Sequence, residues 1–173
     1  MPNAANINRL IEHLQSDNGS HFRMANFADY TFEGADIPIK VMTDPKQIHT
    51  CKTAFCIAGW VNALTAADSD GNRKIGDLNF GSESRAADWL GIDSEQGENL
   101  FFMVSADPEL EEFDELPDAI RKRAAIAVLE HLRDTGEVDW DRAIELAMAQ
   151  KVLPALITDL LNPENKPAVE PVA

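Results

Sequence analysis

Apolar residues recur with the spacing of an α-helix along most of the chain. Near its start, Ile7, Leu10, Ile11 and Leu14 fall on one helical face, which predicts a helix over residues 3–16. Similar stripes and capping residues predict further helices over residues 53–67, 82–90, 93–103, 117–134, 139–150 and 153–161. The 53–67 segment is rich in alanine and other apolar residues, so we expect it to be central. Large side chains expected in the core are Trp60, Trp89, Phe101, Phe102 and Val128.

One stretch has a different period. Apolar and polar residues alternate over residues 28–32 and again over 37–41, on either side of a turn-like Glu-Gly-Ala-Asp. This alternation predicts a small β-hairpin at about residues 27–42. Pro38 lacks the N–H of a central strand, so its arm would lie at an edge.

Length and composition fit one folded domain. The chain has 173 residues, of which 45% are hydrophobic and 26% charged, so it can form a core and does not have the composition of a disordered chain. The expected fold is mainly α, one compact domain of six or seven helices over residues 1–161, with a disordered proline-rich tail over 162–173. No apolar run approaches the roughly 20 residues that span a bilayer, and the first residues lack the features of a signal peptide. We therefore expect a cytoplasmic protein with reduced cysteines.

Negative charge is concentrated in the later part of the chain. Residues 1–66 hold six acidic and five basic side chains, whereas residues 67–173 hold 24 and ten, which accounts for nearly all of the net charge of −15. Charge of this sign repels phosphate backbones and anionic membranes and attracts basic proteins. Direct nucleic-acid binding and membrane binding are therefore disfavoured, and a basic protein is the expected partner.

The densest charge lies in residues 107–118. Leu110, Phe113 and Leu116 recur there at three-residue spacing, which would either anchor the segment on the core or offer an apolar ridge to a partner. Two interpretations stay open: a solvated acidic connector, or an interaction surface that includes Phe113 and the carboxylates. Those carboxylates are Asp107, Glu109, Glu111, Glu112, Asp114, Glu115 and Asp118.

Two cysteines and a histidine lie close together in the sequence. His49, Cys51 and Cys56 follow the pattern His-x-Cys-x4-Cys, but a structural zinc site needs a fourth ligand and no second pair follows. Cys56 falls near the start of the 53–67 helix, where the helix dipole favours a thiolate, and His131 is one of several histidines available as its base. A redox pair and a plain buried core thiol are the remaining interpretations, of which the buried thiol is favoured.

One polar loop resembles the start of a calcium-binding loop. Asp68, Asp70 and Asn72 supply oxygen atoms at positions 1, 3 and 5 of such a loop. The match ends there, because Arg73 stands where a glycine makes the sharp turn and Asn79 stands where a glutamate supplies two ligands. A turn without metal is favoured, and we find no other cofactor motif.

Four short segments occur in a recognisable order. They are Cys-Lys-Thr-Ala-Phe-Cys-Ile-Ala-Gly-Trp over residues 51–60, Ala-Asp-Trp-Leu-Gly over 87–91, Asn-Leu-Phe over 99–101 and Thr-Gly-Glu-Val-Asp-Trp over 135–140. Together they resemble a group of small, uncharacterised proteins of bacteriophages and bacteria, in which a C-x-T-x-x-C-[IL]-A-G segment precedes an L-G…L-F segment. That group has no assigned reaction. The resemblance implies a phage or mobile-element setting, in which an acidic protein would act on a host protein.

Charge asymmetry and the lack of a catalytic constellation together predict a non-enzymatic interaction protein. Its acidic surface would bind a basic host protein and would inhibit it by occupying the surface that normally binds nucleic acid. Two alternatives stay open. One is a hydrolase or transferase that uses Cys56 with a histidine, and the other is a small metal-binding module at residues 68–72 or 49–56.

Overall fold

The structure is a computed structural model that describes residues 1–16, 22, 24, 29–30, 35–44, 53–77, 82–104, 106 and 110–149. It is mainly helical, as the sequence predicts. Its helices are α1 (Ala4–Ser16), α3 (Ile39–Thr43), α4 (Ile57–Asp70), α5 (Glu83–Leu90), α6 (Ser94–Phe102), α7 (Leu110–Glu115), α8 (Asp118–Thr135) and a helix over residues 140–149, with a 3-10 turn at Ile75–Asp77. The described residues thus hold eight α-helices, against six or seven predicted for the whole chain, because α3 and α7 were not predicted as helices.

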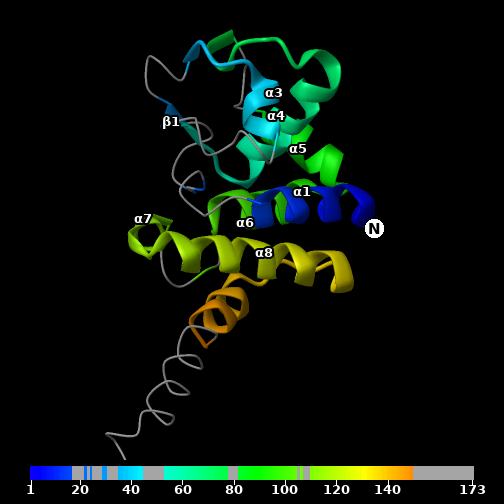
Figure 1. Cartoon of the computed structure of the whole chain (residues 1–173). Helices are drawn as coiled ribbons and strands as arrows, with labels where there is room; N and C mark the ends of the chain where they lie inside the picture. Colours follow the sequence, from blue (N-terminus) through cyan, green and yellow to red (C-terminus); the bar gives the residue numbers. More distant parts are fainter. Residues whose placement is uncertain are drawn as a thin grey trace, which may run out of the picture.

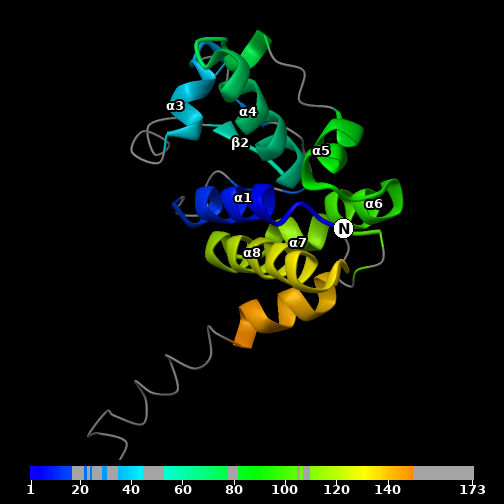
Figure 2. The same cartoon turned by 90° about the vertical axis from the view of Figure 1, so that its right-hand side faces the viewer.

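The helices are arranged on either side of α1 (Figures 1 and 2). α8 lies along one side of α1, and helix 140–149 lies beneath α8. α3 and α4 pack against each other on the other side of α1. α5 contacts α1, α4 and α6, so α5 and α6 together form one end of the molecule, next to the C-terminal end of α8.

The central helix is α4, as predicted. Its first eight residues are all buried, which is the pattern of a helix surrounded by other elements. The ring of Trp60 is fully buried, with its centroid 4.8 Å from that of Phe55 and 4.5 Å from that of His13. The helix begins at Ile57 and not at residue 53, because Thr53–Ala54 form the short strand β2.

The hairpin predicted at residues 27–42 is wrong. Strand β1 (Asp29–Tyr30) pairs antiparallel with β2, and the predicted second arm is the helix α3. Within α3, Ile39 and Met42 are buried and lie three residues apart, and Pro38 precedes them with φ −63°, a value that suits a helix start. So short an apolar run does not distinguish a strand from one helical turn.

Residues with specific capping roles fix the ends of α5 and α6. The hydroxyl oxygen of Ser82 accepts the N–H of Arg85 at 3.3 Å, and Gly91 ends α5 in the left-handed region with φ 69°. Asp93 and Gln96 form a reciprocal capping box at the start of α6. These ends agree with the prediction from the sequence, which was based on the same residues.

The start of α1 is held against the end of α5. The N–H of Asn3 donates to the carbonyl of Leu90 at 2.7 Å, and the Asn6 amide donates to the carbonyl of Trp89 at 2.7 Å. A Cβ atom at Gly91 would lie 2.9 Å from the backbone nitrogen of Asn3, so this close approach also requires glycine. The N-terminus is thereby placed beside the α5–α6 end of the molecule (Figure 2).

Most of the predicted core is confirmed. Trp60, Phe101 and Val128 are at most 2% exposed, and Trp89 is half-buried against the core. Phe102 is 37% exposed, so its prediction as a core residue is wrong. One further step along α6 rotates it about 100° from Phe101, away from the buried side.

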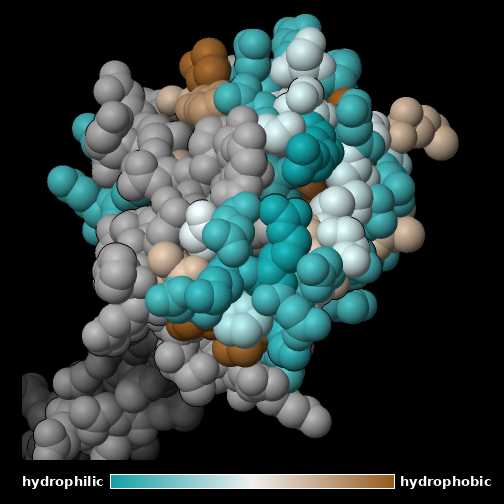
Figure 3. All heavy atoms as spheres, turned by 90° about the horizontal axis from the view of Figure 1, so that it is seen from above, coloured by the Kyte–Doolittle hydropathy of each residue, from teal (hydrophilic) through white to brown (hydrophobic). Residues whose placement is uncertain are grey.

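Two predicted segments lie outside the described residues: the helix over 153–161 and the tail over 162–173. Within the part that is described, no helix is long and apolar enough to cross a membrane. The face seen from above is mainly hydrophilic, with apolar side chains in separate spots (Figure 3). That face therefore offers no continuous apolar surface among the described residues.

Candidate interaction surface

Cys56 lies at the N-cap of α4 and is only 2% exposed. Its sulfur accepts the N–H of Gly59 at 3.4 Å. Burial raises the pKa of the Cys56 thiol from 9.0 to about 11, the bond from Gly59 opposes this rise, and the negative charge of Asp114 adds to it. The expectation that the helix dipole favours a thiolate is therefore wrong, because burial outweighs the helix end. At neutral pH Cys56 is a protonated core thiol.

His131, the residue considered as a base for Cys56, lies on α8. It is half-buried, and its backbone carbonyl accepts the hydroxyl of Thr135 at 2.8 Å. No hydrogen bond joins His131 to Cys56 in the described part of the chain. His49 and Cys51 lie outside the described residues, so the zinc and redox hypotheses stay predictions.

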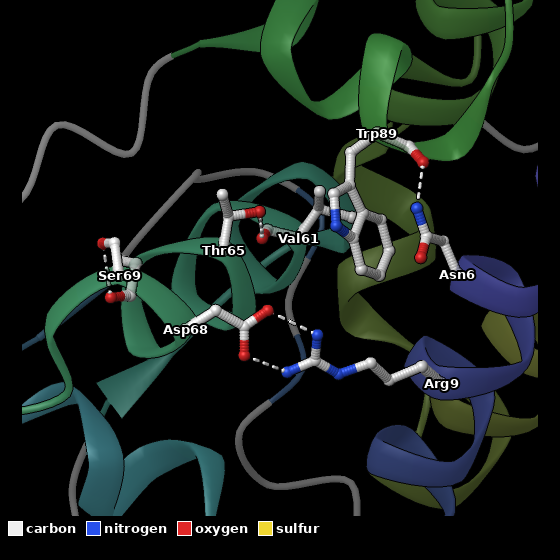
Figure 4. Close-up of polar contacts among 8 residues, drawn as sticks. Asn6, Arg9, Val61, Thr65, Asp68, Ser69 and Trp89 are labelled. Atoms are coloured by element: carbon white, nitrogen blue, oxygen red, sulfur yellow. Dashed lines mark hydrogen bonds and ion pairs between the residues drawn. The ribbon is translucent and has the colours of Figure 1, made fainter.

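The calcium-like residues belong to α4 and the turn that follows it. Asp68 and Asp70 are two residues apart within the helix, a spacing that turns side chains to different sides. The Asp68 carboxylate accepts both terminal nitrogens of Arg9, at 2.6 and 2.7 Å (Figure 4), and this pairing lowers the pKa of Asp68. Asn72 accepts the Lys40 ammonium at 2.6 Å. Among the described residues, no three His, Cys, Asp or Glu side chains converge as metal ligands.

The acidic segment over residues 107–118 includes the short helix α7. Phe113 is fully buried there, with its ring centroid 5.4 Å from that of Trp140, and Leu116 packs against the core. The inclusion of Phe113 in an interaction surface is therefore wrong. It anchors the segment on the core, which is the other role that its spacing predicted.

Internal partners also hold two carboxylates of this segment. Asp114 accepts the backbone N–H of Met24 at 2.9 Å, and Asp118 pairs with Arg121 at 2.6 Å. The Arg121 side chain is 4% exposed and also donates to the carbonyls of Asp114 and Leu116, at 2.6 and 2.8 Å. Arg121 thus satisfies carbonyl groups at the end of α7, which the helix itself leaves unpaired.

Five carboxylates of the segment remain. Two of them, Glu112 and Glu115, are exposed. Asp107, Glu109 and the side chain of Glu111 lie outside the described residues. In the predicted surface, two carboxylates are therefore both exposed and without an ion pair among the described residues. They are Glu112 and Glu115.

A second set of carboxylates lies at the α5–α6 end of the molecule. They come from α5, α6 and the connection between α8 and helix 140–149, and all are exposed except one that is half-buried, Asp139. These carboxylates were not among the site residues predicted from the sequence. We call this set the acidic face: Glu83, Asp93, Glu95, Glu98, Glu137, Asp139 and Asp141.

Two hydrogen bonds bring the parts of the acidic face together. The Gln96 side chain of α6 donates to the carbonyl of Gly136, just after α8. The indole N–H of Trp140 donates to the carbonyl of Asn99 at 3.0 Å. α6 therefore lies between α5 and the residues that follow α8, which places carboxylates on both sides of it (Figure 2).

Two depressions flank α6 within the acidic face. One, of about 130 Å³, lies between α5 and α6 and is lined in part by Glu83 and Glu98. The other, of about 240 Å³, is lined by Glu137, Asp139 and Asp141 beside Trp140. Both depressions are open to solvent, because most of the carboxylates that line them are exposed.

The acidic face has little internal compensation. Glu83, Glu95, Glu98 and Glu137 form no ion pair with any described residue. Arg85 and Arg142 are the two cations in the corresponding sequence, residues 82–104 and 136–142. The potential over this face is therefore negative, and a cation brought to it does not have to displace an existing partner of these four carboxylates.

A third depression, of about 340 Å³, lies between α1, α3 and α4. It holds Arg9 and Lys40 together with Glu12 and Asp68, so both signs of charge are present. Arg9 and Asp68 already pair with each other. The charges around this depression therefore largely compensate each other, unlike those of the acidic face.

Comparison with known proteins adds no relative. No protein-family model, no curated protein and no solved structure matches the chain.

Proposed function

We propose that this chain is a non-enzymatic interaction protein that binds a basic protein through its acidic face. The observation that carries the proposal is a set of exposed glutamates that form no ion pair with any described residue, beside two depressions along α6: Glu83, Glu95, Glu98 and Glu137. An exposed carboxylate that already pairs gains little from a new cation. These carboxylates are hydrated and available, so a complementary basic surface gains both attraction and a faster encounter.

The partner we propose is a host protein that binds nucleic acid. Such a protein presents lysine and arginine side chains spaced to contact phosphate groups. Carboxylates spread over α5, α6 and the residues after α8 would occupy those side chains and exclude nucleic acid. We place the protein, as part of this proposal, in a phage or mobile-element setting, where a chain with a net charge of −15 would find such targets in its host.

The test compares two charge variants in a binding experiment. In the first, Glu83, Glu95, Glu98 and Glu137 are changed to Gln. In the control, four exposed glutamates outside the acidic face, Glu12, Glu112, Glu115 and Glu130, are changed to Gln, which alters the net charge equally. Tagged wild-type and variant chains are incubated with lysate at low and high salt, and retained proteins are identified by mass spectrometry.

We expect a basic protein to be retained by the wild type and the control at low salt, and to be lost in the acidic-face variant. Purified partner should then lose affinity for its nucleic acid when the wild-type chain is added. Binding should also fall steeply with salt, because exposed charges are screened over about 10 Å at 0.1 M. Equal retention by both variants would contradict the proposal. Loss in the control alone would move the contact to α7 and its neighbours.

A further inference from the structure

The depression between α5 and α6 is a groove with an apolar floor and an acidic rim. Its floor consists of Ala87, Gly97 and Phe101, and its rim carries Glu83 and Glu98. At about 130 Å³ it is smaller than the pockets of about 300–1,000 Å³ that hold drug-sized ligands. It therefore has the size of a site for one side chain of a partner.

Gly97 keeps the floor of the groove open. A Cβ atom added there would lie 3.5 Å from the Cβ of Ala87 and 3.5 Å from the ring of Phe101, which are ordinary contact distances. The residue is inside α6 and has no positive φ, so neither the packing nor the backbone requires a glycine. Glycine is also among the least favourable residues within a helix. An alanine would fit the fold and would fill part of the groove.

The charges around the groove decide which side chain it takes. Ser84 and Ser94 lie in the first turns of α5 and α6, and each helix start carries about half a positive charge, which attracts anions. The rim carboxylates and the two carboxylates Asp93 and Glu95 at the start of α6 each carry a full negative charge. The negative charges outweigh the two helix ends, so the groove favours a cation.

Building on the proposed function, we propose that this groove seats one arginine side chain of the basic partner. The methylene stem would pack on Ala87, Gly97 and Phe101, and the guanidinium would lie between Glu83 and Glu98. Arginine fits better than lysine, because its planar fork presents five donors to two carboxylates and nearby serine hydroxyls. The apolar floor then matches the methylene stem of the arginine, and the acidic rim matches its guanidinium group.

A pair of peptides tests whether the methylene stem of arginine packs on the floor of the groove. Both are short oligomers of equal length, one of arginine and one of its analogue with a single methylene between Cα and the guanidinium group. The charged head is the same, so a purely electrostatic contact treats them alike. Each methylene buried on the floor should contribute about fourfold in affinity, and arginine has two more methylenes than the analogue. We therefore expect the wild type to prefer the arginine peptide by roughly fifteenfold in calorimetric titration.

Gly97→Ala and Gly97→Met test the floor. We expect both variants to bind the short-stem peptide as the wild type does and to lose the preference for arginine, partly in Gly97→Ala and fully in Gly97→Met. Thermal unfolding should show Gly97→Ala at least as stable as the wild type, which separates loss of binding from loss of folding. Glu112→Gln with Glu115→Gln is the matched surface control and should keep the full preference.

The outcomes separate this inference from the proposed function. If the acidic-face variant loses the partner but the Gly97 variants keep the arginine preference, the partner binds elsewhere on the face and the groove proposal is overturned. Equal affinity of the wild type for the two peptides also overturns it. So does binding of inorganic phosphate at the groove, detected as shifts of the Ser84 and Ser94 amide signals, because that would identify an anion site at the helix ends. If neither set of variants changes binding, both proposals fail.

Discussion

Two acidic regions of this molecule differ in how many of their carboxylates pair within the fold. The segment at α7 and the start of α8 has the denser charge in the sequence, yet Asp114 and Asp118 have internal partners and Phe113 is fully buried. The acidic face has its carboxylates scattered in sequence, yet most of them are exposed, and its four glutamates form no ion pair within the described part of the chain. Density of charge along a chain therefore does not show which carboxylates stay unpaired and exposed in the folded protein. The decisive property is whether each carboxylate already has a partner within the fold.

Removing the aromatic anchor of α7 should have the largest effect on stability. Phe113→Ala leaves a cavity against Trp140, and we expect a loss of about 3–5 kcal/mol in the free energy of unfolding. Phe102→Ala is the matched control, because Phe102 is 37% exposed and should cost about 1 kcal/mol or less. Urea unfolding of both variants measures the difference. Similar small losses would show that α7 is not anchored as described.

Arg121→Met should have the next largest effect, a loss of about 3 kcal/mol. The change leaves the carbonyls of Asp114 and Leu116 without their charged donor while nearly preserving the apolar volume of the side chain. Arg85→Met, on the exposed side of α5, should stay within about 0.5 kcal/mol of the wild type. Equal free energies of unfolding for the two variants would show that Arg121 does not stabilise the connection between α7 and α8.

Alkaline pH should reveal the coupling of α7 to the core through Cys56. The folded thiol keeps its proton up to a pKa of about 11, whereas the unfolded thiol loses it near 9.0, so the folded state binds more protons between these values. This contribution to stability is complete below pH 9 and is lost as pH rises to 11. We expect it to amount to roughly 2–3 kcal/mol, from two pKa units of about 1.4 kcal/mol each.

Cys56→Ala provides the measurement, because other groups also titrate in this window. Its stability should be lower at pH 8, and the difference from the wild type should shrink as pH rises to 11. Asp114→Asn should reduce the alkaline loss slightly, since the charge of Asp114 contributes to the raised pKa of Cys56. Parallel curves for the wild type and Cys56→Ala would show that the thiol is not protected by burial.

Neutralising the acidic face should have the smallest effect on stability. Glu83→Gln with Glu98→Gln removes two exposed charges that pair with no cation among the residues the structure describes, so we expect a change within about 0.5 kcal/mol. Asp114→Asn with Asp118→Asn, which carries the same change of charge, should cost more because it weakens the contacts to Met24 and Arg121. Thermal unfolding of the two double variants at one salt concentration measures this. A lower stability for the acidic-face variant than for the Asp114 and Asp118 variant would contradict this prediction.

The sequence predicted those elements whose signals are local. The apolar stripe of α1, the capping box at Asp93 and the glycine after α5 each depend on residues within a few positions of one another. α7 was missed because its many carboxylates resemble a solvated connector, although Phe113 has the three-residue spacing from Leu110 that its burial requires. The partner of β1 was missed because β2 lies across an intervening helix in the chain.

The acidic face could not be predicted from the sequence, for a related reason. Its carboxylates extend from Glu83 to Asp141, and only the contact of α5 with α6 and the bond from Gln96 to Gly136 bring them to one end of the molecule. No spacing rule links positions so far apart. A local signal did exist in the excess of acidic over basic residues within 82–104, but it was weaker than that of the acidic segment.

The open floor at Gly97 has a consequence for how this chain would evolve. Any glycine codon becomes an alanine codon by one nucleotide change, and here that change would both strengthen α6 and partly close the groove. Selection for a more stable protein and selection for the partner would therefore act in opposite directions at a single position. In lineages that lose the partner, alanine should replace glycine at this site sooner than the glutamates around it change.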